Sequence, residues 1–369
     1  MMRFIGRSWV LVAPVVALLA VACSEADLPT ADAGVEPPPE TTTTAPADPP
    51  TADDEPAGID SDTDAVEESA SPSEPAEEPT PTVRTEPLLV IDAFGNEVTI
   101  PASPQRVFAG DDTSLANLLS LGVRPAGMAV NQNAVPDFLA EQLDGIEDLS
   151  VEGGLRVNVE GLAALAPDLI IGPGTTLLQV QYGLVSEIAP TYAYEYGYAS
   201  SEEIRTNLTD VARLFGLENR ADEIVAALDA RVADLAGRLA ASDDPDITVS
   251  VLRIFADGFG LSLRHGTTES VLMQEIGIQR PANQQSIEAF ATEITMETLN
   301  EAAADVIYLY VDDPTDTSEY DAILESPLWQ TLEAVQNDRV FLVDGGIWNG
   351  ISIAAAHLIL DDLEATLGL

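Results

Sequence analysis

The sequence predicts an α/β protein of two similar lobes joined by one long α-helix, because one block occurs twice and a long helical pattern lies between its copies. The block at 157–171 returns at 294–308, with a glutamate, a leucine and an aspartate each shifted by 137 residues. Each copy pairs a short capped helix with an apolar run typical of a buried strand. Gly122 and Gly277, which end helical stretches before a strand, repeat in the same way.

The N-terminus has the features of an export signal. Two arginines precede an apolar run at 9–22, which is shorter than the roughly 20 residues that cross a bilayer. The run ends at Cys23, the only cysteine, so no intramolecular disulfide forms. The stretch LAVAC at 19–23 resembles a bacterial lipoprotein box, with Ala20 where leucine is preferred, and the resemblance implies that Cys23 is acylated. We expect a signal peptide over 1–23 and an extracytoplasmic protein that a lipid anchors to the outer face of the cell membrane. Cleavage by an ordinary signal peptidase is the alternative.

Residues 24–86 have the composition of a disordered acidic tether. They contain 18 acids, 12 of the 25 prolines and one arginine, with too few apolar side chains to form a core. From 87 onward, 12 arginines and no lysine face 45 acids, a net charge of −33. Such a surface repels phosphates, so we expect no nucleic acid partner.

The first lobe is predicted over 87–217. Alternating apolar positions around a turn at 92–96 favour a hairpin over 88–100. Short apolar runs then alternate with helical stretches, which indicates a parallel sheet. The expected strands are 106–109, 127–130, 169–171 and 191–194, and the expected helices include 114–121 and 202–214.

A helical pattern of 23 residues follows at 219–241, within a connecting segment that we place at 218–243. At 1.5 Å per residue it spans about 35 Å, enough to join two lobes rigidly. The second lobe is predicted over 244–369, where strands and helices alternate again. Its expected elements are 247–255, 268–275, 306–310, 328–335, 340–343 and a closing helix at 353–367.

Several stretches together resemble the ferric-siderophore and cobalamin class of substrate-binding proteins that serve ABC importers, and the resemblance covers 88–369. It implies the class III periplasmic binding protein fold, two Rossmann-like lobes bridged by one helix. The matching stretches are DAFGNEVTIP at 92–101, PQRV at 104–107, the block from Glu160 to Ile171, SEIAPT at 186–191, ETL at 297–299, ADVI at 304–307, PLWQ at 327–330 and AVQNDRV at 334–340.

Glu160 and Glu297 are the first candidate functional residues. An acid in the first turn of a helix is stabilised by roughly 0.3–1 kcal/mol through the helix dipole and needs no other reason. The resemblance implies a role instead, because the family presents one glutamate on each lobe, at these two positions, to arginines of the membrane permease. Two acids on similar lobes suit a two-fold symmetric permease dimer.

Ligand-binding candidates follow from the rule that open α/β sheets bind ligands beyond the carboxyl ends of their strands. On the first lobe we expect the ligand to contact Asp112, Asn131, Arg156, Thr175, Tyr196 and Tyr198. Tyr192 and Tyr194 precede the last two at a spacing of two residues, and we expect them to pack within the strand. On the second lobe the candidates are Arg253, Phe255, Arg264, His265, Tyr310 and Trp348.

The ligand that the resemblance implies is a ferric siderophore. Such complexes are often anionic and bulky, so arginines and flat aromatic side chains are the expected lining. The siderophore satisfies the coordination of iron, so we expect no cofactor and no protein ligand to a metal. Haem, with Tyr196 or Tyr198 as an axial ligand, and cobalamin are alternatives in the same class.

A different class of function is a surface or sensory protein that reuses this fold without transport. Catalysis is disfavoured, since the GLSLR stretch at 260–264 has arginine where a nucleophile elbow requires glycine. The glycine-rich stretch at 172–174 lacks the lysine of a phosphate loop. We therefore expect a monomeric, non-enzymatic protein whose partners are a ferric siderophore and an ABC permease.

Overall fold

The structure is a computed structural model, and it describes residues 84–130, 137–151, 157–196, 201–255, 258–264, 266–286, 289, 291–312 and 318–369. The predicted signal peptide, Cys23 and nearly all of the predicted tether lie outside the described residues. In the described part, no helix is both long enough and apolar enough to cross a membrane. The description begins at Arg84, whose guanidinium donates to the carbonyls of Pro101, Arg213 and Leu214.

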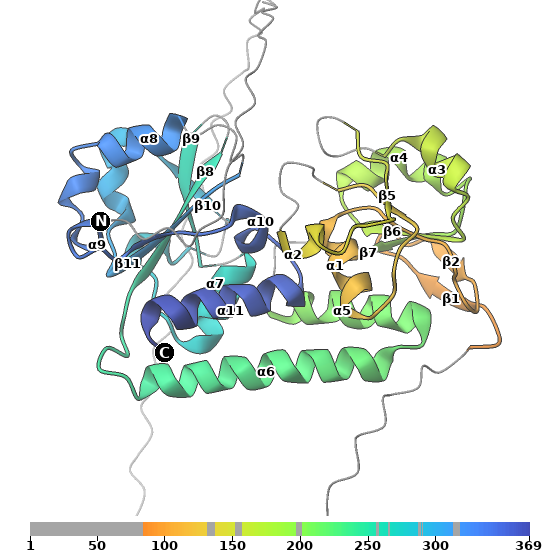
Figure 1. The fold of residues 1–369 in the computed structure, drawn as a ribbon, viewed down its shortest axis with the longest axis horizontal. Helices are drawn as coiled ribbons and strands as arrows, with labels where there is room; N and C mark the ends of the chain where they lie inside the picture. The colour runs from red at the N-terminus through yellow and green to blue at the C-terminus, as the bar shows by residue number, and fades with distance from the viewer. Residues whose placement is uncertain are drawn as a thin grey trace, which may run out of the picture. The chain divides into compact units, whose positions relative to one another are not determined.

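The first lobe begins with an antiparallel hairpin and continues as a parallel sheet (Figure 1). The hairpin pairs β1 (Leu88–Ile91) with β2 (Glu97–Ile100), as the sequence predicts. All five strands of the sheet run parallel in the order β5-β4-β3-β6-β7. They are β3 (Val107–Ala109), β4 (Gly127–Met128), β5 (Glu147–Asp148), β6 (Leu169–Pro173) and β7 (Thr191–Tyr194).

In the described residues, four helices lie between these strands and a fifth, α5, follows the last strand. Asp111 caps the first of them by accepting from the backbone N–H of Ser114 at 2.9 Å. Gly122, just beyond its end, has a φ of +78°, a conformation that glycine adopts without a Cβ clash. The helices are α1 (Asp112–Ser120), α2 (Asp137–Ala140), α3 (Val159–Leu165), α4 (Thr176–Val185) and α5 (Ser201–Phe215).

The long connecting helix is α6 (Glu218–Ala240), which has the predicted length of 23 residues and begins and ends one residue earlier than predicted. Its buried residues, Ala221, Leu228, Val232, Leu235 and Leu239, fall at helical spacing. It packs against α5 of the first lobe and against α7 and α11 of the second (Figure 1). Arg205 on α5 bonds both Asp229 on α6 and Glu275 on α7, so one side chain ties all three helices together.

The second lobe has a mixed sheet, and here the predicted strand-helix alternation is incomplete. The order is β10-β9-β8-β11-β12, in which β8, β11 and β12 are parallel while β9 runs antiparallel to both of its neighbours. The sequence analysis missed β9 and β10, because each is short and rich in small or polar residues. The strands are β8 (Val249–Phe255), β9 (Gly258–Ser262), β10 (Ala291–Ile294), β11 (Val306–Val311) and β12 (Val340–Leu342).

The helices of the second lobe also depart from the simple pattern. The second copy of the repeated block forms a 3-10 helix, η2 (Met296–Ala302), where the first copy forms the α-helix α3. The segment expected to be one helix at 328–335 is broken into η3 (Trp329–Thr331) and α9 (Glu333–Gln336). The others are α7 (Thr268–Ile276), η1 (Ala282–Gln284), α8 (Ser318–Glu325), α10 (Gly345–Trp348) and α11 (Ile353–Leu367).

The repeated aspartate has the same structural role in both lobes. Asp168, just before β6, accepts from the backbone N–H groups of Gln105 and Arg106, which precede the neighbouring strand β3. Asp305, just before β11, accepts from the backbone N–H and the hydroxyl of Thr248, which precedes β8. Each aspartate therefore fixes the start of the strand that pairs in parallel with its own.

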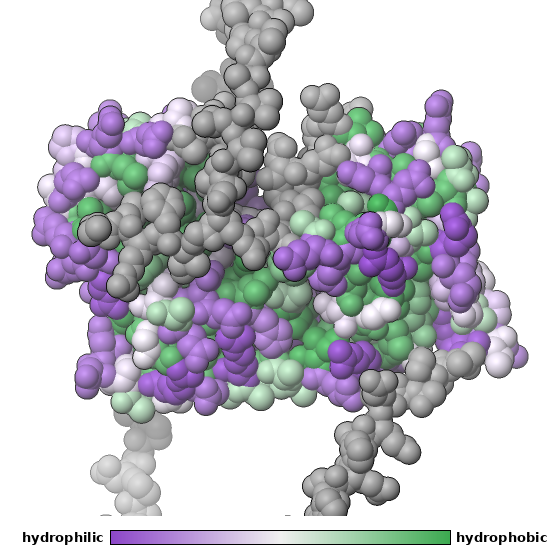
Figure 2. Space-filling model, in the orientation of Figure 1, coloured by the Kyte–Doolittle hydropathy of each residue, from purple (hydrophilic) through white to green (hydrophobic). Residues whose placement is uncertain are grey.

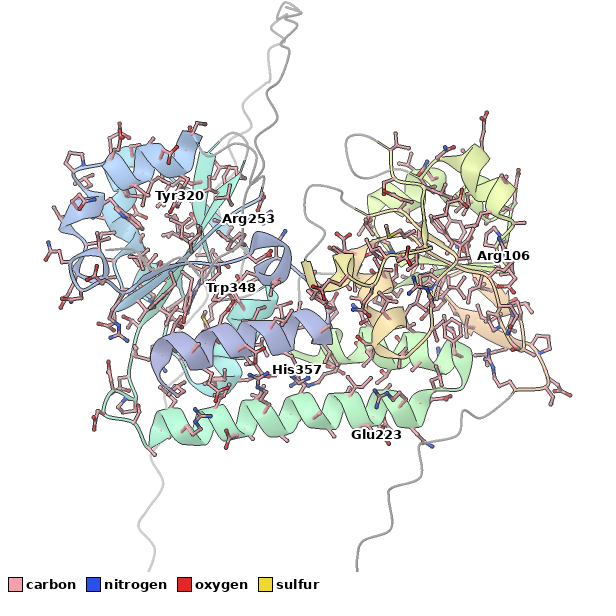
Figure 3. The ribbon with its side chains drawn as sticks, viewed as in Figure 1. Arg106, Glu223, Arg253, Tyr320, Trp348 and His357 are labelled. Carbon is pink, nitrogen blue, oxygen red and sulfur yellow. The ribbon has the colours of Figure 1, made fainter. Side chains whose placement is uncertain are left out.

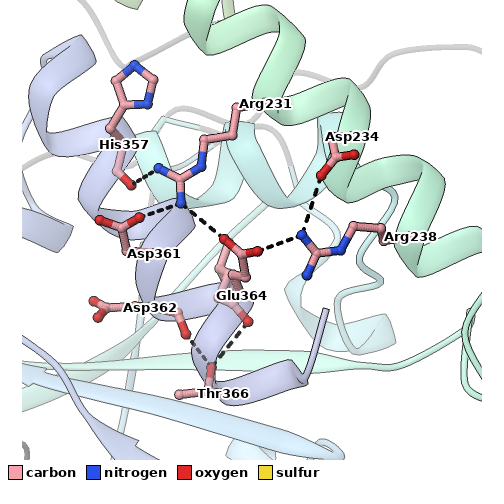
Figure 4. Close-up of polar contacts among 9 residues, drawn as sticks. Arg231, Asp234, Arg238, His357, Asp361, Asp362, Glu364 and Thr366 are labelled. Carbon is pink, nitrogen blue, oxygen red and sulfur yellow. Dashed lines mark hydrogen bonds and ion pairs between the residues drawn. The ribbon is translucent and has the colours of Figure 1, made fainter.

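The connecting helix is also held to the closing helix by ion pairs (Figure 4). Arg231 on α6 bonds Asp361 and Glu364 on α11, and it donates to the carbonyl of His357 at 3.0 Å. Arg238, two turns further along α6, also bonds Glu364. His357 is thus part of the contact between α6 and α11. Its half-buried position lowers its pKa, and the positive charge of Arg231 adds a smaller lowering.

Candidate functional site: a cavity between the lobes

A cavity of about 330 Å³ is lined by residues of both lobes. This volume is within the range of small-molecule sites in proteins. The first lobe contributes the segments that follow β3, β4, β6 and β7, which is the carboxyl edge of its parallel sheet. The second lobe contributes α10 and the loop from Asn349 to α11. The site therefore lies where the strand-end rule predicts it on the first lobe.

Two consecutive acids at the start of α1 form part of the first-lobe wall. Asp111 caps α1, and its other carboxylate oxygen accepts a short hydrogen bond from the hydroxyl of Tyr194. Burial raises the pKa of Asp111, while the bonds from Ser114 and Tyr194 oppose that rise. Asp112, a predicted ligand contact, lies beside it in the cavity lining and is half-buried.

Thr175 and Tyr196, also predicted, complete this wall. Thr175 caps α4, and its buried hydroxyl has no hydrogen-bond partner among the described residues. Tyr196 follows β7 and is 37% exposed, whereas Tyr192 and Tyr194 within that strand are buried, as we expected. Partial burial, with the charges of Asp111 and Asp112 adding to it, raises the pKa of Tyr196 to about 12. Tyr196 therefore offers a neutral phenol to the cavity.

The second-lobe wall consists mainly of small residues. Gly345 packs so closely that an added Cβ would lie 2.5 Å from the carbonyl oxygen of Val311 on β11. The carbonyl of Gly350 accepts from the hydroxyl of Thr268 at 2.7 Å, and Ser352 caps α11. These contacts fix the backbone that faces the cavity.

Trp348, labelled in Figure 3, is on α10 but is not among the residues that line the cavity. It is fully buried, its indole N–H donates to Asp362 at 2.8 Å, and its ring lies 4.5 Å from that of Tyr308. Tyr310, another predicted contact, is also fully buried. In this conformation a ligand would reach neither side chain. The positions of Trp348 and Tyr310 therefore do not support the prediction that they contact a ligand directly.

The predicted arginines lie outside the described lining. Arg253 on β8, labelled in Figure 3, donates through Nε and Nη2 to Asp312. The shortest of these bonds is 2.7 Å, so the charge of Arg253 is paired. Arg264 is exposed at the end of β9 and donates to Gln285. Phe255 is half-buried at the end of β8. The remaining predicted contacts lie outside the described residues: Asn131, Arg156, Tyr198 and His265.

The repeated glutamates are both exposed. Glu160 is in the first turn of α3, which Asn158 caps, and Glu297 is in the first turn of η2. A hydrogen bond from Thr295 lowers the pKa of Glu297, so this carboxylate is ionised at neutral pH. The geometry leaves both side chains accessible from solvent, as a docking role requires.

Sequence analysis underestimated two features of the cavity. It singled out Asp112 but gave no separate role to Asp111, although an aspartate three residues before a serine is a capping signal. On the second lobe it singled out Trp348 and its neighbour Asn349, of which Asn349 lines the cavity, but not the glycines of this wall, which carry no side-chain chemistry. Among the described residues, no group of three or more potential metal ligands occurs.

Hydrophilic residues are frequent on the surface of both lobes. On the face shown in Figure 2 they are interspersed with apolar residues, which are also seen along the middle. This pattern agrees with the negative charge of the sequence. An acidic exterior of this kind favours solubility and repels anionic macromolecules.

Comparisons with known proteins agree with this architecture. The chain is 29% identical over 311 residues to the probable siderophore-binding lipoprotein YfiY of Bacillus subtilis, covering 80% of this chain and 90% of that protein. It is 28% identical over 288 residues to the ferric-anguibactin-binding protein FatB of Vibrio anguillarum, covering 74% of this chain and 86% of that protein.

A solved structure gives the same result for the fold. The siderophore periplasmic binding protein from the fuscachelin gene cluster of Thermobifida fusca superposes with a TM-score of 0.61 and 28% identity, over 73% of this chain and 99% of that one. A sequence profile described as periplasmic binding protein matches residues 107–345, which include both sheets and α6. The chain belongs to the periplasmic binding protein family, with two α/β lobes joined by one long helix.

Proposed function

We propose that this protein is an extracytoplasmic substrate-binding protein that captures a ferric siderophore between its two lobes and delivers it to an ABC permease. The observation that carries the proposal is a cavity enclosed by both lobes at the carboxyl edge of a parallel sheet, in a chain whose relatives are named for ferric-siderophore binding. Binding and release, rather than a reaction, is the mechanism. The siderophore itself supplies the ligands of the iron.

The way α6 is held suggests how the lobes move. This helix packs against elements of both lobes, and Arg205, Arg231 and Arg238 bond it to its neighbours on either side. A rigid connector of this kind resists a wide hinge motion and favours a small tilt of one lobe on the other. The cargo would therefore enter and leave through modest changes at the mouth of the cavity.

Delivery to the permease is proposed to use Glu160 and Glu297. Each is exposed in the first helical turn of the corresponding block of its lobe, so the two are matched in position. Carboxylates pair well with arginine in bidentate geometry. Attachment through an acylated Cys23, with 24–86 as a tether, would keep the protein near the membrane that holds the permease.

A titration tests the proposed capture. Adding ferric hydroxamate, ferric catecholate, ferric citrate, haem or cobalamin to the purified protein should change tryptophan fluorescence for one ferric siderophore class, because Trp348 is buried against the cavity wall. The iron-free siderophore is the control. A Soret band with haem, or saturation with cobalamin alone, would favour those ligands. Silence towards all of them would favour a surface or sensory role without transport.

Charge reversal tests the docking residues. Cells whose only copy of the gene carries Glu160→Arg and Glu297→Arg should lose iron uptake from the bound complex at least about tenfold, because arginine would repel arginine at two contacts. Ligand affinity of the purified variant should stay unchanged. The matched control is Asp222→Arg, an equal change at an exposed position of α6. Normal uptake by the double variant would rule out this docking mode.

A further inference from the structure

The described lining of the cavity contains negative but no positive side chains. Asp111 and Asp112 stand at its first-lobe wall, and no arginine or histidine is among the described residues that line it. Its other polar groups are neutral and include Thr175, Tyr196 and Asn349. Among the described lining residues, an anionic ligand would therefore find hydrogen bonds but no compensating charge.

Two arginines of the second lobe, Arg253 and Arg280, are already engaged within the lobe. Arg253 is neutralised by Asp312 through three hydrogen bonds of 3.1 Å or less. Arg280 is 5% exposed and donates into the core, to the carbonyl of Ser262. Arg264 donates to Gln285 and makes no ion pair with an acid among the described residues, but it lies outside the described lining.

The excess of acidic over basic side chains also holds for the rest of the folded sequence. The stretches of 84–369 that the structure does not describe contain, by sequence, one arginine against five acids. The folded part as a whole has a net charge of −33 over 87–369. Such a field lowers the local concentration of anions and raises that of cations near the opening of a cavity.

We infer that the cargo is a ferric complex without net negative charge, neutral or cationic, rather than an anionic catecholate or carboxylate complex. The inference rests on the proposed function and narrows the class of ligand at the same cavity. It also replaces the expectation of an arginine-lined site for an anionic complex. A pendant ammonium group on the ligand would lie best toward Asp112, on the acidic wall at the start of α1.

One series of ligands isolates charge from iron coordination. Ferrioxamine B is a tris-hydroxamate iron(III) complex with a free ammonium group and is cationic. Acetylation of that amine makes the complex neutral, and succinylation makes it anionic, while the iron centre stays the same. We expect the cationic and neutral forms to bind the protein at least about tenfold more tightly than the anionic form at low salt, with the difference shrinking as salt rises.

A substitution at the acidic wall sharpens the test. Asp112→Asn should reduce the ratio of cationic to anionic affinity by about tenfold, because it removes one negative charge from the lining. Asp222→Asn, the same chemical change on an exposed face of α6, should leave the ratio unchanged. Circular dichroism and the unfolding midpoint confirm that each variant is folded.

The outcomes separate this inference from the function on which it rests. Equal affinity along the series, tightest binding of the succinylated form, or binding of only the anionic catecholate or citrate complexes would overturn the inference and leave ferric-siderophore capture standing. Failure of every ferric complex to bind would overturn both. A charge preference that Asp112→Asn does not change would show that the acidic wall is not its source and would also contradict the inference.

Discussion

Each lobe has its own five-stranded sheet with a parallel core, but the two lobes present different groups to the cavity. In the first, β3 leads through Asp111 into α1 and on to β4, so a helix start with two acids faces the site. In the second, β8 turns back directly into antiparallel β9, so no helix starts at the equivalent place. The second lobe instead offers the backbone of α10 and the loop after it. The repeat has preserved the hydrogen bonds by which Asp168 and Asp305 hold the start of a neighbouring strand, but not the wall of the cavity.

Each lobe also contains a carboxylate with a raised pKa, and the two differ in position. Asp111 lines the cavity and is held by Ser114 and Tyr194. Glu269 at the start of α7 is fully buried, and the hydroxyl of Ser262 at the end of β9 donates to it at 2.7 Å. Burial raises the pKa of Glu269, and the positive charge of Arg280 opposes the rise. The first acid can act on a ligand, whereas the second acts on the stability of its lobe.

The largest expected effect is on this buried cluster. Arg280→Met should lower the free energy of unfolding by about 3 kcal/mol, because it removes a buried hydrogen bond to Ser262 and the positive charge nearest to Glu269. Urea unfolding measures the change. Arg264→Met, at an exposed position of the same lobe, should cost less than about 0.5 kcal/mol. Adding Glu269→Gln to Arg280→Met should recover part of the loss; no recovery would contradict the proposed coupling.

A second comparison concerns two glycines of the cavity lining, Gly110 in the first lobe and Gly345 in the second, which each pack against a backbone carbonyl of a strand. An added Cβ at Gly345 would lie 2.5 Å from the carbonyl oxygen of Val311, while one at Gly110 would lie 3.0 Å from that of Ile171. Gly345→Ala should therefore shift the backbone, cost about 2 kcal/mol and weaken ligand binding, whereas Gly110→Ala should cost less. Thermal unfolding and ligand titration of both variants provide the measurement. Equal effects at the two positions would show that the walls are packed alike.

The smallest expected effect is on the hydrogen bonds by which Asp168 and Asp305 hold the start of a neighbouring strand. Asp168→Asn and Asp305→Asn should each cost about 1 kcal/mol, since an amide keeps only part of the hydrogen bonding. Bonds from Thr248 lower the pKa of Asp305 in the folded state. Its stabilisation is thus complete above the ordinary aspartate pKa of about 3.9 and is lost as the pH falls through the lower folded value. Unfolding at pH 7 and pH 3 measures this, and a variant penalty that persisted at low pH would contradict it.

The sequence predicted the parts of the fold that repeat or have a strong period. The doubled block, the hairpin and the 23-residue helix all follow from local patterns, and the structure contains each of them. It did not predict β9, because the glycines at 258 and 260 hide the alternation of a strand. It also overestimated the regularity of the second copy, since the capping box of Thr295 suits a 3-10 turn as well as an α-helix.

For the candidate site, strand-end reasoning identified one wall and missed the other. Asp112, Thr175 and Tyr196 lie in the cavity lining because they directly follow strands or cap the helices after them. Arg253 is not among them because it pairs with Asp312, which directly follows the adjacent strand β11. A pairing between residues so far apart in the chain cannot be predicted from the sequence. Trp348 lies one layer deeper, where tertiary packing rather than sequence position decides orientation.

Hydrogen exchange with and without the tightest-binding ferric complex tests most directly whether both lobes enclose the cargo. The account predicts that binding slows amide exchange in two separate places, the start of α1 in the first lobe and the segment from α10 to the start of α11 in the second. Exchange along the exposed face of α6 should not change. Protection confined to one lobe would contradict capture between the two.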